Sequence, residues 1–417
     1  MNDLRRTLLW SVLAVSLLML WDGWLRHTGQ PSLFAPAPAV VEAPASAASG
    51  SGTPSASPAL ASATAVAASN GASAPTPAAP HELVTITTDV VQATVDSDGA
   101  TLVKVELLKH KSQAHPDQNM VVLDKTAAHT YVAETGLIGG SAAQALPNHT
   151  TPFVVVSQER TLADGAAQLE LKLASVPVNG VKLVKTYTFK RGDYAIGVKQ
   201  EVVNASAATV HPQLYVQLTR DGSPAEATKN PASFMGGPVA YTGMAVYNAK
   251  GKYQKLTFEK LAEGKAEFEK LDDNGWVAMV QHHFASAWLQ NDKVAREFYS
   301  KKLATNLYAT GMLFNLGDVA AGQSKAFEST LFVGPQEENK LKALAPGLEY
   351  TKDYGWTHIM AAPLFWLLDK IHGLIGNWGW AIVALVVLLK AAFYWLNASA
   401  YRSMAKMKAL NPRIQAM

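Results

Sequence analysis

Near its C-terminus the chain carries a single charged side chain inside a long apolar stretch. From Trp378 to Leu396 the only charged residue is Lys390. A helix rises about 1.5 Å per residue, so a run of roughly 19 residues matches the 30 Å of bilayer hydrocarbon. The pattern predicts a transmembrane helix over residues 377–397. An ionisable group within such a helix is costly and usually marks function.

Two explanations account for this lysine. Lys390 lies six residues before Leu396, which places its ammonium roughly 9 Å from that end of the helix. A lysine side chain can reach the headgroups over that distance while its methylenes stay in lipid. Alternatively, the ammonium lines a polar groove within the membrane and attracts acidic groups there. Position alone is consistent with both.

The segments on either side of the predicted span are amphipathic. Residues 356–376 have one apolar face at helical spacing, formed by Met360, Leu364, Leu367, Ile371 and Leu374. Because Pro363 and several polar residues interrupt this segment, and because a true span follows, we expect an interfacial helix rather than the core helix of a soluble domain. After the span, residues 398–417 contain no acidic residue and present a basic face of Arg402, Lys406, Lys408 and Arg413.

The N-terminus predicts a second membrane segment. Residues 1–6 include Arg5 and Arg6, and residues 7–25 are mainly apolar. A cleaved signal peptide is the alternative, but Trp21 and Trp24 stand where small cleavage-site residues would be expected, which favours an uncleaved transmembrane anchor. Basic residues flank both predicted spans on the terminal side, so the positive-inside rule places both termini in the cytoplasm.

The region between the two spans divides into a linker and a folded domain. Residues 26–80 are rich in Ala, Pro and Ser, which predicts an extended linker. Residues 81–350 alternate apolar and polar side chains between turn signals such as Asp98-Gly99, which predicts an all-β, two-sheet sandwich. We read residues 275–289 as one strand, so that His282 and His283 would point to opposite faces.

Composition excludes several classes of function. The 417 residues contain no cysteine, which removes disulfides, thiolate metal sites and thiol catalysis. A net charge of +3 is too small to indicate nucleic-acid binding. The chain has no nucleotide-binding glycine loop. We therefore predict no catalytic residues, no metal site and no cofactor, and a protein that is not an enzyme.

Three motifs near the C-terminus carry a family resemblance. Asp353-Tyr-Gly-Trp356, Gly376-Asn-Trp-Gly-Trp380 and the run from Ser403 to Met417 occur in the order found at the start of the conserved core of the YidC membrane-protein insertases. The chain resembles the Gram-negative type of this YidC/Oxa/Alb family, which implies a membrane protein with a periplasmic β-supersandwich over residues 81–350. In that family the helix at 377–397 carries a basic residue, usually arginine, in a hydrophilic groove. Lys390 occupies that position, so the resemblance favours the groove.

The resemblance also implies a function. Such proteins assist the insertion, folding and assembly of inner-membrane proteins, alone or with the Sec translocon and its accessory subunits. The implied partners are hydrophobic nascent clients and the lipid bilayer. Residues 398–417 would open a cytoplasmic helical hairpin, and four further core helices of the family are expected outside these 417 residues. The alternative is a membrane-tethered periplasmic sandwich that binds glycans or folding proteins, which leaves Lys390 unexplained.

Overall fold

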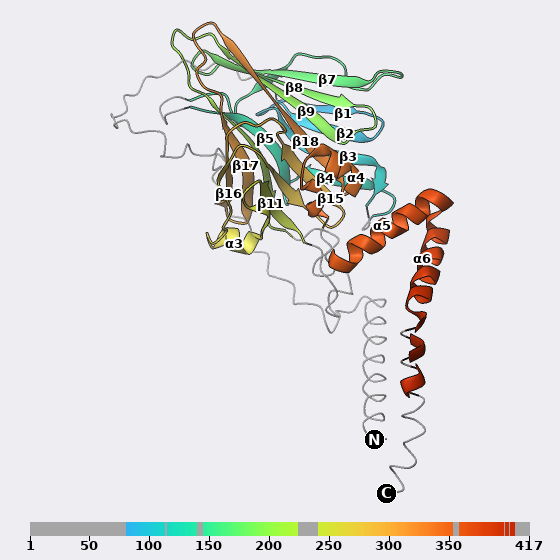
Figure 1. The fold of residues 1–417 in the computed structure, drawn as a ribbon. Helices are drawn as coiled ribbons and strands as arrows, with labels where there is room; N and C mark the ends of the chain where they lie inside the picture. Colours follow the sequence, from blue (N-terminus) through green and yellow to red (C-terminus); the bar gives the residue numbers. More distant parts are fainter. Residues whose placement is uncertain are drawn as a thin grey trace, which may run out of the picture. The chain divides into compact units, whose positions relative to one another are not determined.

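Two large antiparallel sheets dominate the computed structural model, which describes residues 81–112, 115–139, 145–223, 241–352, 358–395, 397–399 and 401–404 (Figure 1). The predicted cytoplasmic N-terminus, first span and linker, residues 1–80, lie outside the described residues. So do Lys406, Lys408 and Arg413 of the predicted basic face.

Each sheet has nine strands. The first sheet has the spatial order β1 (Leu83–Thr87), β2 (Val91–Asp96), β3 (Thr101–Lys111), β4 (Asn119–Lys125), β5 (Thr130–Ile138), β10 (Gln213–Asp221), β17 (Leu307–Asn315), β16 (Arg296–Ala304) and β13 (Leu271–Asp272). The second has the order β12 (Lys252–Leu256), β11 (Gly243–Asn248), β14 (Trp276–Val280), β15 (Phe284–Leu289), β18 (Ser324–Pro335), β9 (Ala195–Asn204), β8 (Val181–Lys190), β7 (Gln168–Ser175) and β6 (Phe153–Val155).

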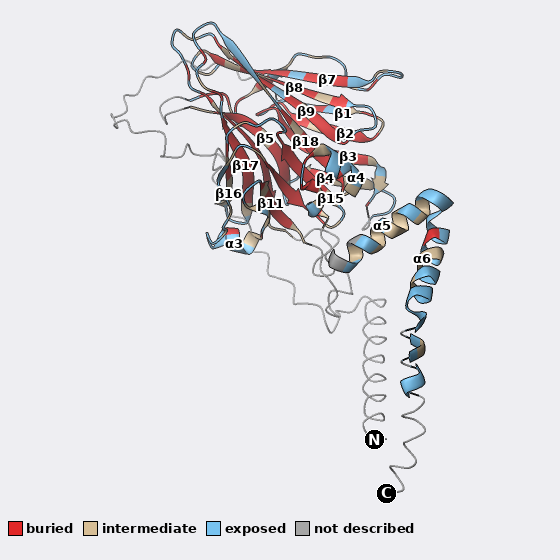
Figure 2. Cartoon of the chain, viewed as in Figure 1, coloured by how far each residue is buried: buried red, intermediate tan, exposed pale blue. Residues whose placement is uncertain are grey.

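The two sheets pack face to face around one core, which confirms the predicted fold class. Strand β8 shows the pattern: Val181, Leu183, Lys185, Tyr187 and Phe189 are buried, and the alternate residues between them are half-buried. This is the period of two that a strand imposes on its side chains. Contacts between the sheets include a hydrogen bond from the Trp288 indole to the carbonyl of Gln217, at 2.9 Å. Figure 2 shows the strands as mainly buried.

The interpretation of residues 275–289 as one strand is wrong. The structure divides them into β14 and β15, which pair as a hairpin in register from Trp276–Leu289 to Val280–Ala285. His282 and His283 lie in the turn between the two strands, and their rings stack with centroids 3.8 Å apart rather than pointing to opposite faces. Both strands are buried on both faces, so they lack the alternation that would have revealed the turn.

The segment that leaves the second sheet packs back against it. After β18, helix α4 (Glu338–Leu344) and the 3₁₀ helix η3 (Leu348–Thr351) bury Leu341 and Leu348 completely. The Trp276 indole donates to the carbonyl of Pro346 at 3.0 Å and stacks on Tyr247, with ring centroids 5.4 Å apart. These contacts explain why β14 is covered on the face that does not meet the first sheet. One further short helix, α3 (Phe258–Ala262), follows β12.

Candidate functional site: the α5–α6 hairpin and Lys390

Two helices, α5 (His358–Ile375) and α6 (Trp378–Ala392), form a hairpin whose sharp bend has a local cause. Gly376 ends α5 in the left-handed region at φ +73° and donates its amide to the carbonyl of His372 at 2.7 Å. Asn377 then caps α6 by accepting from the amide of Trp380 at 3.2 Å. The rings of His372 and Trp378 stack across the bend at 3.8 Å. The sequence Gly-Asn therefore separates the two helices.

Lys390 lies on the exposed face of α6. Ala381 is fully buried, and Ala384, Leu385 and Leu389 are half-buried, which marks one side of the helix. At 100° per residue Lys390 is about half a turn from Ala381. It shares its face with Val383, Val386 and Val387, each about half exposed. Figure 2 shows most of α6 as exposed, so its apolar surface has no protein partner over much of its length in the described chain.

The predicted apolar face of residues 356–376 lies within α5. Leu364, Leu367 and Ile371 are half-buried, whereas Met360 and Leu374 at the two ends of the face are 70% and 89% exposed. Pro363 falls within the first turns of the helix without ending it. The described stretch 401–404, which is helical, contains Arg402 as an exposed residue.

Helix α6 is shorter than the predicted span. It ends at Ala392, where Phe393 caps it at φ −90° and ψ 3°. In the part of the chain that the structure describes, no single helix has the length and apolar composition to cross a bilayer. Trp378–Ala392 and Asn397–Met404, bent by 54° at the break between them, meet those criteria together.

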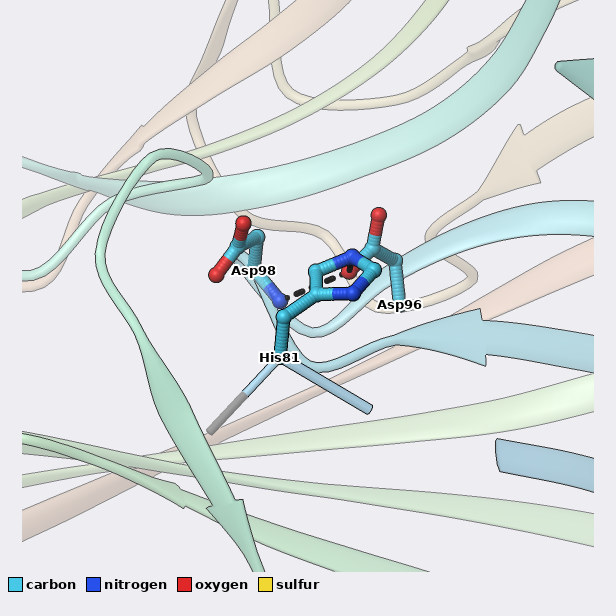
Figure 3. Close-up of side chains that lie close together, drawn as sticks. All are labelled: His81, Asp96 and Asp98. Atoms are coloured by element: carbon cyan, nitrogen blue, oxygen red, sulfur yellow. Dashed lines mark hydrogen bonds and ion pairs between the residues drawn. The ribbon is translucent and has the colours of Figure 1, made fainter. Parts of the chain in front are cut away.

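A second candidate site lies in the β domain, where sequence analysis predicted none. His81 precedes β1, Asp96 ends β2, and Asp98 follows in the β2–β3 turn; Figure 3 shows their side chains close together. Among the described residues they form the one group of three whose possible metal-ligand atoms all lie within 4.8 Å of one another. Only the tertiary structure identifies these three residues as a candidate metal site, because nothing in their sequence spacing resembles a metal-binding motif.

Two buried cations in the sandwich are structural. Lys185, on β8, is fully buried and donates to the carbonyls of Gly99 and Thr135 at 2.6 and 2.8 Å. Burial lowers the pKa of Lys185 to about 7, and the nearby charge of Glu134 opposes this only partly. The Arg296 guanidinium donates to the carbonyls of Asp273, Gly275, Gln290, Asp292 and Val294 at 2.6 to 3.0 Å. It therefore ties the loops around β14 and β16 together.

The chain thus combines a two-sheet β domain with a largely exposed, apolar helical hairpin. A family model described as the YidC periplasmic domain matches residues 83–367, and one described as the 60Kd inner membrane protein matches residues 370–417. The chain is 46% identical over 415 residues to the membrane protein insertase YidC of Janthinobacterium sp. (strain Marseille), covering 99% of this chain and 72% of that protein. It is also 46% identical over 421 residues to the YidC of Bordetella avium (strain 197N), covering 100% and 73%.

The chain belongs to the YidC family of membrane protein insertases. It is an inner-membrane protein with a periplasmic β domain, and insertion, the function of the family, is not enzymatic. The resemblance identified from the three C-terminal motifs is confirmed.

Two solved structures that align with the chain are much less similar. A galactose mutarotase related enzyme from Lactobacillus acidophilus aligns with 60% of this chain and 97% of its own, at 11% identity and a TM-score of 0.39. A galactose mutarotase-like protein from Lactobacillus casei ATCC 334 aligns with 60% of this chain and 100% of its own, at 11% identity and a TM-score of 0.37.

Proposed function

We propose that this protein assists the insertion of hydrophobic segments into the inner membrane, and that Lys390 supplies a positive charge to arriving clients. The observation that carries the proposal is the placement of one ammonium on the exposed apolar face of α6, between Trp378 and Leu396. A charge in lipid costs about 2.5–3.5 kcal/mol at the centre of a helix, so a lysine there is expected to have a hydrated surrounding or a functional partner.

The mechanism needs no bond chemistry. In a hydrated groove, the ammonium of Lys390 would attract acidic residues in the part of the client that must cross the membrane. The client's hydrophobic segment would then move into lipid, driven by removal of its apolar surface from water. An arginine would supply the same charge but with a planar, five-donor group.

Charge and amphipathic pattern support a particular arrangement in the membrane. We place the span at residues 377–397, α5 in the interface, and both termini in the cytoplasm, with an N-terminal anchor at 7–25 and a linker at 26–80. The exposed Trp366 and Leu374 of α5 suit a helix that lies along the headgroups. The basic face of Arg402, Lys406, Lys408 and Arg413 suits the cytoplasmic surface. The same proposal includes that this protein acts in membrane-protein insertion either alone or together with the Sec translocon.

The test compares clients that differ in the charge of their translocated end. Cells depleted of their own insertase receive the gene with Lys390→Ala, Lys390→Arg or the control Lys370→Ala, which changes an exposed lysine of α5. Protease protection then measures the insertion of one acidic and one neutral client. We expect Lys390→Ala to reduce the insertion of the acidic client only. Proteins with Lys390→Arg or Lys370→Ala should insert both clients. Equal insertion of both clients by Lys390→Ala would show that the Lys390 ammonium only extends to the lipid headgroups and does not attract acidic clients.

A further inference from the structure

Three side chains at the start of the β domain have the geometry of an incomplete coordination sphere. The Nε2 of His81 lies 3.0 Å from Oδ1 of Asp96, and the carboxylate of Asp98 offers a third ligand atom within 4.8 Å of both. Two ligands of a tetrahedral zinc ion, with bonds of about 2.1 Å, stand about 3.4 Å apart. The separation of His81 and Asp96 therefore needs little change for both atoms to bind one ion.

The backbone holds the three residues in place. Asp96 is 6% exposed, and its Oδ1 accepts from the amide of Asp98 at 2.9 Å. The neighbour of His81, Glu82, is fixed by two bonds to Ser97: the Glu82 amide donates to the Ser97 hydroxyl at 2.8 Å, and the Ser97 amide donates to the Glu82 carbonyl at 2.9 Å. The backbone therefore holds the three residues close together before an ion arrives, which reduces the entropy lost on binding.

We propose that His81, Asp96 and Asp98 bind one divalent transition-metal ion of the Zn²⁺ class. One imidazole nitrogen and two carboxylate oxygens are ligands that zinc accepts, whereas Mg²⁺ and Ca²⁺ prefer oxygen alone. Water would complete the coordination, because His81 and Asp98 are both exposed.

A neighbouring lysine competes for the same carboxylate. The ammonium of Lys125 lies 3.7 Å from Oδ2 of Asp96, and its side chain is about half exposed. At that distance and exposure the ion pair is weak and the long side chain is free to turn to solvent. A bound dication would replace both this pair and the pair between His81 and Asp96.

The ion would fasten the first described residue of the domain to the β2–β3 turn. His81 directly follows the Ala/Pro/Ser-rich segment that ends at Pro80. Coordination would therefore strengthen the attachment at the point where that segment joins the β domain. The domain has its own large core, so we expect it to fold without the ion and to gain stability from it.

The experiment measures zinc binding by the full chain, without a histidine tag, in detergent. Competition with a chromogenic zinc indicator gives the affinity and stoichiometry for the wild type, His81→Gln and Asp98→Asn. The matched control is His129→Gln, which disrupts another histidine–carboxylate pair, His129–Asp221 at 2.6 Å, that belongs to no three-ligand group among the described residues. Intrinsic fluorescence and the thermal midpoint without zinc verify that every variant is folded.

We expect one zinc ion per chain, a dissociation constant at least about tenfold weaker in His81→Gln and Asp98→Asn, and no change in His129→Gln. Zinc should raise the thermal midpoint of the wild type and of His129→Gln more than that of the other two variants. Equal zinc affinity in all four proteins, or no binding in the wild type, would overturn the proposal and leave the cluster as a set of surface ion pairs. Equal affinity for Mg²⁺ would contradict the assigned metal class.

Discussion

Replacing Lys185 with methionine should remove one contribution that raises the stability of the β domain as pH rises from 7 to 10. The ammonium is fully buried between the sheets, with two carbonyl acceptors and no carboxylate bonded to it. Burial lowers the pKa of Lys185 from 10.5 to about 7. That difference corresponds to about 5 kcal/mol of free energy opposing folding when the lysine must remain charged.

The sign follows from proton binding. Between pH 7 and 10.5 the unfolded chain keeps the proton on Lys185 while the folded domain loses it. The free energy of unfolding therefore rises with pH in that window, by up to about 1.4 kcal/mol per pH unit. Below pH 7 both states are protonated and the full cost of burying the charge is present. The methionine variant has no such contribution, but it leaves the carbonyls of Gly99 and Thr135 without this donor. The free energy of unfolding of Lys185→Met should thus be closest to that of the wild type near pH 7. The wild type should become increasingly more stable than the variant as pH rises.

The assay is urea unfolding of residues 81–352, which hold both sheets and η3, followed by the fluorescence of Trp276 and Trp288 from pH 7 to 10. The control is Lys182→Met on the same strand, where the side chain is half-buried on the opposite face. Parallel stability curves for the wild type and Lys185→Met would refute the reasoning. A wild type whose stability falls with pH relative to the variant would do the same.

Three further substitutions test the contacts that hold the domain together, each by the urea midpoint of the same fragment. Arg296→Met should cost about 3–5 kcal/mol, because five loop carbonyls lose their donor; a loss below 1 kcal/mol would contradict that role. Gly347→Ala should cost about 2–4 kcal/mol, since φ is +78° and a Cβ there would lie 2.3 Å from the Tyr247 ring. An unchanged midpoint would show that the structure accommodates the added Cβ without strain. Asn204→Ala should cost about 2–4 kcal/mol, as its buried amide donates to two carbonyls at 2.8 Å; equal stability would mean that water replaces it.

Local patterns in the sequence determined the class of fold and several of its turns. In β8 the alternation of apolar and polar residues predicts that Val181, Leu183, Tyr187 and Phe189 face inward, and the structure buries all four. The Asp98-Gly99 turn joins β2 to β3 as expected. These features depend on neighbours two to four residues apart, where strand period and turn chemistry act directly. The same period also places Lys185 in phase with Leu183 and Tyr187, so its burial could have been inferred from sequence.

Only the tertiary structure decided which distant segments meet. Strand β9 pairs with β18 more than a hundred residues later, and nothing in either strand specifies that partner. The turn at His282 was hidden because both faces of its two strands are buried, which removes the alternation that marks a strand end. His81 meets Asp96 and Asp98 because β1 and β2 pair in one particular register. Burial and long-range pairing depend on the whole fold, whereas the single charge of Lys390 in an apolar stretch was visible in the sequence alone.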